Sequence, residues 1–178
     1  MFTLQYLFGD KDTKKVKRED RKAKSFCTFD APNTKSMAYN DTLTMKNRIE
    51  EVGRLPQFLD SLCEATGCDD TLSFNLNLAL EEAVVNVINY AYPKDGNEYP
   101  FTLDVRAVKE NEGTTLVFTL TDRGTPFDPT KAADADTTLS AQDRPIGGLG
   151  IFLVRRLMDS VSYQYVDGSN VLTMTKKV

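Results

Sequence analysis

Apolar and polar residues alternate along several short stretches of the chain, which is the pattern of half-buried β-strands. The stretches are residues 43–47, 101–108, 115–121, 160–166 and 170–176. Residues 109–113 connect the second stretch to the third as a hairpin loop, and Asp167 and Gly168 form the turn between the last two. The pattern therefore predicts one lone strand followed by two hairpins.

Three other stretches place apolar residues every three or four positions, which predicts amphipathic helices. The first covers residues 49–65, ends at Gly67 and contains Pro56, which starts or kinks a segment of it. A long second helix is capped at residues 69–71 and must end by Pro93, and a short third one covers residues 148–158. One face of the long helix is expected in the core: Leu72, Leu76, Leu80, Ala83, Val87 and Ala91.

The resulting order is strand, two helices, two strands, loop, helix and two strands. Its adjacent hairpins favour an α+β fold with a mixed, mostly antiparallel sheet and the helices on one face. Residues 122–146 are rich in Gly, Pro, Asp and Thr and predict a long irregular connection. A loop of that length in a compact domain is usually functional, as a lid is.

The 178 residues have an ordinary globular composition, with 40% hydrophobic and 27% charged side chains, and predict one domain. We expect that domain at residues 41–178, after a charged N-terminal extension at residues 1–40. The first 24 residues carry eight basic and four acidic side chains. This basic arm is read either as a contact for nucleic acid or an acidic partner, or as a solvated tail. A start at Met37 or Met45 is a further hypothesis for the extension.

The chain contains no histidine, which excludes Ser-His-Asp and Cys-His catalysis, imidazole metal ligands and phosphohistidine in this polypeptide. Its three cysteines have spacings that suit neither a zinc site nor a redox pair, so we expect free thiols in a reducing cytoplasm. The residues after the first 24 carry 14 basic and 22 acidic side chains, and this acidic balance argues against direct nucleic-acid binding by the domain. No run of 18 apolar residues is present, so we expect no membrane contact and a cytoplasmic protein.

A polar flank on the long helix is the first candidate for chemistry. Glu82 and Asn86 are four residues apart, so they lie on consecutive turns beside the core face, with Asn75 and Asn89 nearby. An Asn oxygen can ligate Mg²⁺ beside a triphosphate without adding charge, and a Glu can accept a proton from an attacking hydroxyl. Taken alone, the same residues also fit an ordinary solvated helix flank.

Two glycine-containing loops follow. Asp122 ends an apolar strand, where burying its carboxylate requires a donor such as an adenine amino group, and Gly124 would let the backbone approach a flat base. Residues 146–150 (IGGLG) open a helix whose first amides could hold an anion. Taken alone, the first loop also fits a common turn, and the second also fits a flexible hinge.

Together, these elements resemble the GHKL ATP-binding superfamily and, within it, the anti-sigma-factor serine kinases of the RsbW/SpoIIAB type. Residues 81–92 (EEAVVNVINYAY) are similar to that family's N box, residues 122–129 (DRGTPFDP) to its first glycine box, and residues 147–151 (GGLGI) to its second. The resemblance covers residues 41–178. It implies a two-layer α/β sandwich of the Bergerat type.

The resemblance also implies roles for individual residues. Asn86 would hold Mg²⁺ against the phosphates of ATP, Glu82 would be the catalytic base, and Asp122 would accept from the adenine amino group. Arg144 is the nearest candidate for an arginine that reaches the terminal phosphate, because Ile146 stands where many members have it. The nucleotide contacts implied are Asn86, Asn89, Tyr90, Asp122, Gly124, Pro126, Phe127, Gly147, Gly148, Leu149, Gly150 and Thr173.

Two further departures from the family pattern affect the site. Tyr90 stands where the family often has His, and we expect nucleotide binding to persist because Tyr keeps the size and polar tip. The family's late Thr near the adenine aligns with Asn170, so Asn170 and Thr173 are both candidates for its role.

The function implied is an ATP- and Mg²⁺-dependent serine/threonine protein kinase and anti-sigma factor in a partner-switching circuit. Its substrate would be a small STAS-domain antagonist, a sigma factor would be a second partner, and the kinase would be a homodimer. The alternative is a non-catalytic, nucleotide-gated protein that sequesters a transcription factor. A third reading, the catalytic domain of a sensor histidine kinase, would need a histidine supplied by another chain.

Overall fold

The computed structural model describes residues 36–131 and 149–178. Most of the expected N-terminal extension, Cys27, and the candidate residues Arg144, Gly147 and Gly148 therefore lie outside the described residues. No helix within these two ranges is long and apolar enough to cross a lipid bilayer.

Five strands form one open sheet in the order β1-β2-β3-β5-β4. Their bounds are Ser36–Lys46 for β1, Pro100–Glu110 for β2, Gly113–Asp122 for β3, Ser160–Val166 for β4 and Ser169–Lys177 for β5. β1 begins at Ser36 and not at Leu43, so residues 36–40 belong to this strand and not to the expected extension. Ser36 pairs with Lys109 at the end of the strand, and Met45 pairs with Phe101 near the other end.

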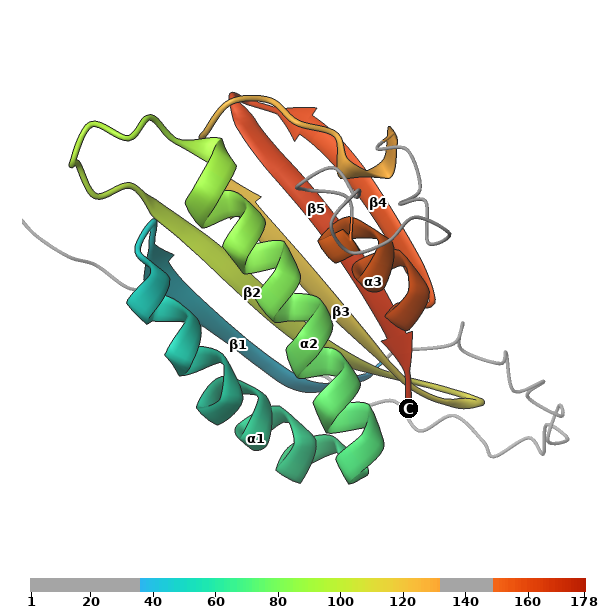
Figure 1. Ribbon diagram of the computed structural model, residues 1–178. Coiled ribbons are helices and arrows are strands. Elements are labelled where there is room, and N and C mark those ends of the chain that lie inside the picture. Colours follow the sequence, from blue (N-terminus) through green and yellow to red (C-terminus); the bar gives the residue numbers. More distant parts are fainter. Residues whose placement is uncertain (1–35, 132–148) are drawn as a thin grey trace, which may run out of the picture. The chain divides into compact units, whose positions relative to one another are not determined.

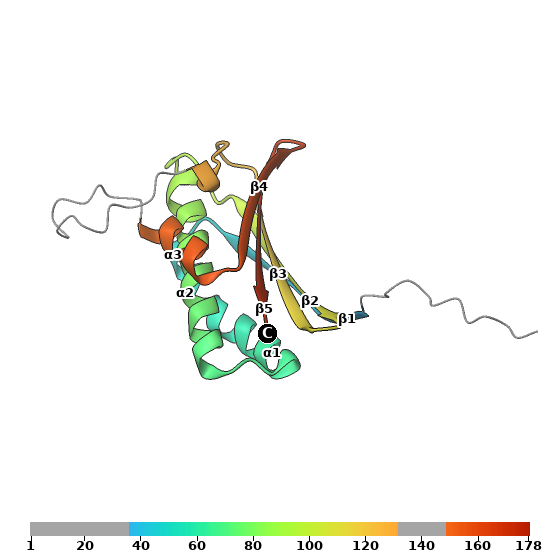
Figure 2. The same cartoon turned by 90° about the vertical axis from the view of Figure 1, so that its right-hand side faces the viewer.

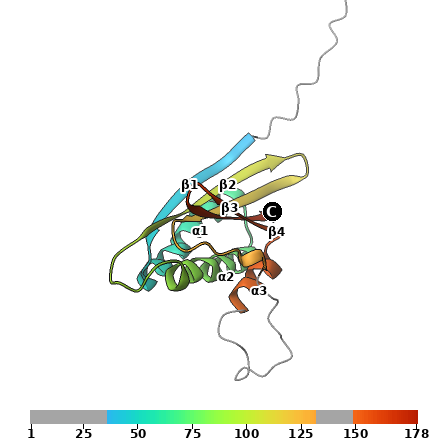
Figure 3. The same cartoon turned by 90° about the horizontal axis from the view of Figure 1, so that it is seen from above.

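The helices lie on one face of this sheet, and the other face carries none of the described elements (Figures 1 and 2). They comprise a 3₁₀ segment η1 (Ile49–Arg54), α1 (Leu55–Thr66), α2 (Asp70–Asn86), a π-helical turn η2 (Val87–Ala91), a 3₁₀ turn η3 (Pro129–Lys131) and α3 (Leu149–Leu157). Figure 3, which views the molecule from above, shows α2 and α3 on one side of the strands. The expected α+β fold with helices on one face is confirmed.

The expectation of a mixed sheet is wrong in one respect, because all four strand pairs are antiparallel. Two hairpins account for the β2–β3 and β4–β5 pairs. Between β1 and β2 the chain runs along α1 in one direction and returns along α2 in the other (Figure 1). β2 therefore starts beside the end of β1 and runs in the opposite direction. A single crossover helix would instead have produced a parallel pair.

The helix boundaries follow from local chemistry. Asp69 caps α2 through a 2.7 Å hydrogen bond that its carboxylate accepts from the Leu72 amide. Gly67 ends α1 in the left-handed conformation, with φ of 75°, as glycine does at low cost. Pro56 lies in the first turn of α1, where its missing amide hydrogen removes no helical bond, so it starts the α-helix after the 3₁₀ segment.

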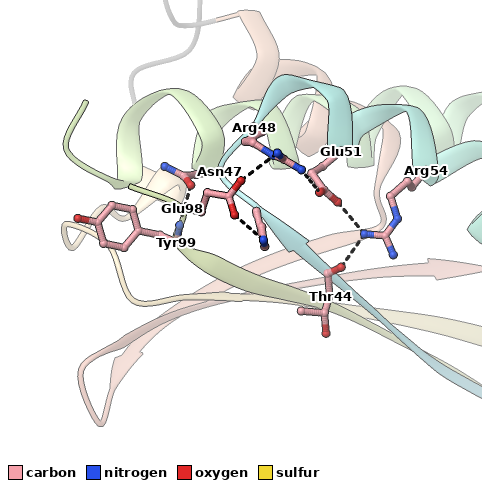
Figure 4. Close-up of polar contacts among 8 residues, drawn as sticks. Thr44, Asn47, Arg48, Glu51, Arg54, Glu98 and Tyr99 are labelled. Carbon is pink, nitrogen blue, oxygen red and sulfur yellow. Dashed lines mark hydrogen bonds and ion pairs between the residues drawn. The ribbon is translucent and has the colours of Figure 1, made fainter. Parts of the chain in front are cut away.

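A polar network fastens the start of the helical layer to the end of β1 (Figure 4). Glu98, in the loop before β2, pairs with Lys46 and with Arg48, whose guanidinium is 2.9 Å from its carboxylate. Glu51 accepts from Arg54 at 2.6 Å, and Arg54 also donates to the Thr44 carbonyl at 2.8 Å. These contacts fix where α1 begins relative to the sheet.

The core lies between the helices and the sheet. Its largest fully buried side chains come from both layers: Phe118, Met45, Leu55, Leu59, Leu62, Leu76, Leu80, Leu103, Leu116, Leu120, Met174 and Val84. Two polar side chains, Asp122 and Asn170, are buried beside this core, with 7% and 6% of their surface exposed. Both lie at the same end of the sheet, because they pair with each other across β3 and β5.

Candidate functional site

A cavity of about 390 Å³ opens at that end of the sheet, between the C-terminal part of the long helix and strands β3, β4 and β5. Its walls are mostly apolar, with a few polar groups, as is usual for a small-molecule site. It is lined by Ala83, Asn86, Val87, Tyr90, Ala91, Leu120, Asp122, Thr125, Pro126, Phe127, Pro129, Ile151, Tyr163, Asn170 and Leu172.

The helical side of the cavity contains the π-helical turn η2. In this turn, the carbonyl oxygens of Ile88 and Ala91 accept hydrogen bonds from outside the helix. The Lys94 ammonium donates to Ile88 at 3.1 Å, and the Thr125 amide donates to Ala91 at 2.7 Å. Such turns occur frequently at functional sites. Here the wide turn joins the helix directly to the loop after β3.

The close contact between the π-helical turn and the loop after β3 depends on Gly124. A side chain at position 124 would place its Cβ 2.6 Å from the Ala91 carbonyl carbon and Cβ, and closer still to the carbonyl oxygen. These atoms belong to backbone and to a short side chain, which cannot move aside easily. The loop thus approaches the helix as closely as it does only because residue 124 is glycine.

On the sheet side, Asp122 and Asn170 share a buried hydrogen bond of 2.9 Å from the Asn170 amide to Asp122 Oδ1. The Gly124 amide donates to the same oxygen at 2.8 Å. Tyr163 donates to Asn170 Oδ1 at 2.7 Å, and burial raises the pKa of the Tyr163 hydroxyl, which keeps it a donor. The carboxylate therefore lies in the cavity wall with one oxygen already bound by two donors.

Tyr92 supports the same loop from behind. Its ring stacks on that of Tyr99 with centroids 4.8 Å apart, and its hydroxyl donates to the Pro100 carbonyl at 3.2 Å. The same hydroxyl accepts from the Arg123 amide at 3.1 Å, and burial raises its pKa. This contact holds the backbone between Asp122 and Gly124.

Beside the cavity, Asn86 places a polar side-chain atom that has no hydrogen-bond partner in the described part of the chain. Its side-chain nitrogen is buried and has no hydrogen-bond partner among the described residues, although Asn86 lines the cavity. Rotation of the terminal amide by 180° exchanges its nitrogen and oxygen, so either end can face a ligand. No group of three His, Cys, Asp or Glu side chains in residues 36–131 and 149–178 could hold a metal ion. A single amide oxygen beside a phosphate ligand fits Mg²⁺, which takes few ligands from protein.

Glu82 lies one turn before Asn86 and contacts the start of α3. A Cβ at position 150 would overlap its Oε2 and would lie 3.2 Å from its Cδ. Glu82 is half-buried and is not one of the residues that line the cavity. Its carboxylate therefore marks the place where α2 meets the first turn of α3.

The structure brings most of the described candidate residues together. Asn86, Tyr90, Asp122, Pro126 and Phe127 line the cavity, and Gly124 and the Glu82–Gly150 contact adjoin it. Leu149 begins α3.

Two expected nucleotide contacts lie elsewhere. Asn89 is exposed and does not line the cavity. Thr173 lies between Leu172 and Met174, which are buried under the helices, so its side chain is on the opposite face of the sheet. Of the two residues considered for the late Thr, only Asn170 reaches the cavity.

Sequence reasoning did not find the roles of Tyr163 and Tyr92. Period-two alternation along β4 places Tyr163 on the same face as Leu172, with which it pairs, and could have suggested its position. The hydrogen bond from the Arg123 amide to Tyr92 joins residues 31 apart in the chain and has no local signature.

The chain is similar in sequence to proteins of a known family. A family model described as the histidine kinase-like ATPase domain matches residues 45–176. The chain is 33% identical over 104 residues to the serine/threonine-protein kinase BtrW of Bordetella bronchiseptica, a match that covers 58% of this chain and 70% of that protein. It is 30% identical over 108 residues to the serine-protein kinase RsbW of Bacillus cereus, covering 58% of this chain and 63% of that one.

A solved structure of the RsbU and RsbW domains of a Mycobacterium tuberculosis protein has a similar fold. The TM-score is 0.51 at 17% sequence identity, and the match covers 78% of this chain and 32% of that one. At this identity the likeness concerns the fold alone.

Proposed function

Because this chain belongs to the histidine kinase-like ATPase domain family, we propose that it is an ATP-dependent serine/threonine protein kinase. The observation that carries the proposal is that Asp122 and Asn86 line the same cavity. A buried acceptor for an exocyclic amino group and an unpaired amide suited to Mg²⁺ are the two polar needs of a bound adenine nucleotide.

In this proposal the base lies among the apolar cavity walls, with its amino group donating to Asp122. The phosphates extend past Asn86 toward Gly150 at the start of α3. Arg144, Gly147 and Gly148, which lie outside the described residues, would also contact them. When bound, Mg²⁺ held by Asn86 would neutralise phosphate charge. Tyr90, 62% exposed at the cavity wall, would cover the nucleotide from the solvent side.

Phosphoryl transfer then requires one proton acceptor from this chain. The partner's hydroxyl oxygen forms a bond to the terminal phosphorus while the bond to the bridging oxygen breaks and ADP leaves. Glu82 takes the hydroxyl proton. Its position on the turn next to Asn86 and against Gly150 supports this role, because it lies beside the segment proposed to contact the phosphates.

The partner is proposed to be a small STAS-domain antagonist that carries the acceptor serine or threonine. We further propose that the protein sequesters a sigma factor, works as a homodimer and acts in the cytoplasm. The relatives named as serine-protein kinases support the class of activity, and the chain spans about 63% of the length of the RsbW relative.

A second candidate is a nucleotide-gated binding protein that transfers nothing. It is favoured by one observation, that Glu82 does not line the cavity. It predicts retained ATP or ADP without any labelled partner.

The deciding experiment is incubation of the protein with Mg²⁺ and ATP labelled at the terminal phosphate, alone and with STAS-domain proteins from the same genome. Label on a serine or threonine of a partner supports the kinase. The variant Glu82→Gln keeps the shape of Glu82 and removes its basicity, so transfer should fall by roughly 10²–10⁴-fold while ATP binding persists. Tight nucleotide binding with no transfer to any partner would select the second candidate, and no binding at all would end both.

A further inference from the structure

We propose that Cys63 and Cys68 form a dithiol site, which a hydroperoxide converts reversibly into a disulfide. The pair lies where α1 ends and α2 begins, away from the proposed nucleotide site. Four residues separate the two cysteines in the sequence, a spacing that matches no common redox motif. The turn between the two helices brings their thiols together.

This turn folds Cys68 back onto the last turn of α1. The amides of Gly67 and Cys68 both donate to the Cys63 carbonyl, at 2.8 Å and 3.3 Å. Gly67 has the left-handed conformation that allows the reversal. At helix ends of this kind, the residue after the left-handed one frequently contacts the residue five positions before it. Here those two positions are Cys68 and Cys63.

Hydrogen bonds between side chains fix the two thiols in this place. The Thr66 hydroxyl donates its only proton to the Leu62 carbonyl at 2.8 Å, so in its 3.3 Å contact with the Cys68 sulfur the thiol is the donor. The Cys63 thiol is hydrogen-bonded to Cys68 and to Ser73, which lies in the first turn of α2. The two sulfurs are therefore in contact while both are free thiols.

The surroundings of the two thiols differ, and this difference gives the reaction an order. Burial raises the pKa of the Cys63 thiol to about 12, and its hydrogen bond with Cys68 adds to the effect. Cys63 therefore keeps its proton at neutral pH. Because the thiolate is the reactive form of cysteine, the first oxidation is assigned to Cys68 and the second step to Cys63. Both side chains are half-buried, so neither is closed off from a small oxidant.

The oxidation takes two steps when the hydroperoxide is hydrogen peroxide. In the first step, the Cys68 sulfur forms a bond to one peroxide oxygen, the O–O bond breaks, and the other oxygen leaves as water with the thiol proton. Cys68 is then a sulfenic acid. In the second step, the Cys63 sulfur forms a bond to the Cys68 sulfur, the S–O bond breaks, and the leaving hydroxyl takes the Cys63 proton as water. The two sulfurs together lose two electrons, and the peroxide gains them.

The dithiol site and the cavity lie at opposite ends of α2. Asn86, which lines the cavity, ends the helix that Asp70 begins, and a helix of this length spans about 24 Å. Of the described residues that line the cavity, none belongs to α1 or to the turn after it. The dithiol site and the proposed nucleotide site can therefore be tested separately.

The test is peptide mass spectrometry of the full chain after exposure to hydrogen peroxide and alkylation of the remaining thiols. The chain has no Lys or Arg between Arg54 and Lys94, so trypsin releases both cysteines in the single peptide 55–94, and Cys27 falls in another. We expect peptide 55–94 to lose two hydrogen atoms and to take up no alkyl group. After dithiothreitol it should take up two. Cys27→Ser is the matched control and should leave this result unchanged.

The unaltered protein decides the outcome, so no variant has to fold. The proposal would be overturned by a peptide 55–94 that still takes up two alkyl groups after peroxide, gains oxygen on its cysteines, or is cross-linked to another peptide. The order of the steps is tested with dimedone, which labels sulfenic acids. Dimedone should label Cys68 in Cys63→Ser more strongly than Cys63 in Cys68→Ser, and equal or reversed labelling would overturn the assigned order.

Discussion

The carboxylate of Glu82 occupies the space that a side chain at position 150 would need. An added Cβ there would overlap Oε2 of Glu82 and lie 3.2 Å from its Cδ. The proposed base on α2 and the first turn of α3 are therefore in contact because residue 150 is glycine. Any group larger than hydrogen at that position must displace Glu82.

The substitution Gly150→Ala tests this relationship. The obstructing atom is at the far end of a flexible side chain, so Glu82 can swing away and the fold should tolerate the change. Alanine also favours a helix over glycine, so the free energy of unfolding should stay unchanged or rise by up to about 1 kcal/mol. Phosphoryl transfer should fall by roughly 10–100-fold, because the base is misplaced.

The measurement pairs a urea unfolding curve with a transfer assay on the same preparation. Gly53→Ala is the control, because a Cβ at position 53 meets nothing within 4 Å. Unimpaired transfer by Gly150→Ala would show that the contact has no part in catalysis.

Gly124→Ala should behave in the opposite way. Here the obstructing atoms are the Ala91 carbonyl group and Cβ, which cannot move aside, and the 2.7 Å hydrogen bond from the Thr125 amide to Ala91 would be strained or lost. We expect the free energy of unfolding to fall by about 1–3 kcal/mol, as in overpacked sites, together with weaker nucleotide binding. Chemical denaturation gives the first quantity and calorimetry the second, and a variant as stable as the original would refute the close approach.

Asn86→Ala tests the proposed Mg²⁺ site. The substitution removes a buried amide nitrogen without a partner, so the free energy of unfolding should not fall. Affinity for ATP in the presence of Mg²⁺ should decrease by roughly 10–100-fold, the range found when metal sites lose supporting groups. After chelation of Mg²⁺, the variant and the unaltered protein should bind ATP equally well, and a persistent difference would place the role of Asn86 elsewhere.

The network at the start of α1 makes stability depend on pH. The hydrogen bond from Arg54 holds the pKa of Glu51 below its ordinary value of 4.5, and Arg48 contributes less. A lowered pKa in the folded state means that the contribution is present above pH 4.5 and is lost as the pH falls through the folded-state value.

Glu51→Gln should therefore destabilise the protein by roughly 0.2–1 kcal/mol at pH 7, the range for partly exposed pairs. The difference from the unaltered protein should shrink as the pH falls below 4.5. Thermal unfolding at several pH values gives the comparison, with Glu64→Gln on the exposed side of α1 as control. A destabilisation that persists unchanged in acid would mean that packing, and not charge, is responsible.

Sequence periodicity was sufficient for the five strands and three α-helices, although not for the first half of β1 or for the π-helical turn, because most of their boundaries have a local cause. The Asp69 cap, the left-handed Gly67 and the Asp167–Gly168 turn, with φ of 51° and 73°, all act within a few residues. The same pattern could not predict that every strand pair is antiparallel, since this follows from how α1 and α2 return the chain.

Candidate site residues could be predicted where a short sequence motif contains them. They could not be predicted where their contacts are with residues far away in the sequence. Asp122 and Asn86 could be named from their neighbours in sequence. The choice between Asn170 and Thr173 depends on which face of β5 meets the helices. Once Leu172 is known to be buried, strict alternation places Asn170 on the same face and Thr173 on the other. The contacts of Asn170 with Asp122 and of Gly150 with Glu82 join segments 48 and 68 residues apart, and only the tertiary structure reveals them.

The π-helical turn at Val87–Ala91 has a consequence for how this region tolerates change in length. Such a turn holds one residue more than an α-helix of the same height, so Tyr90 and Ala91 are rotated from where a regular helix would place them. Deleting a single residue there would let the helix relax into ordinary winding and would turn both residues away from the loop after β3. The helix would become more regular, and the binding site would lose one of its walls.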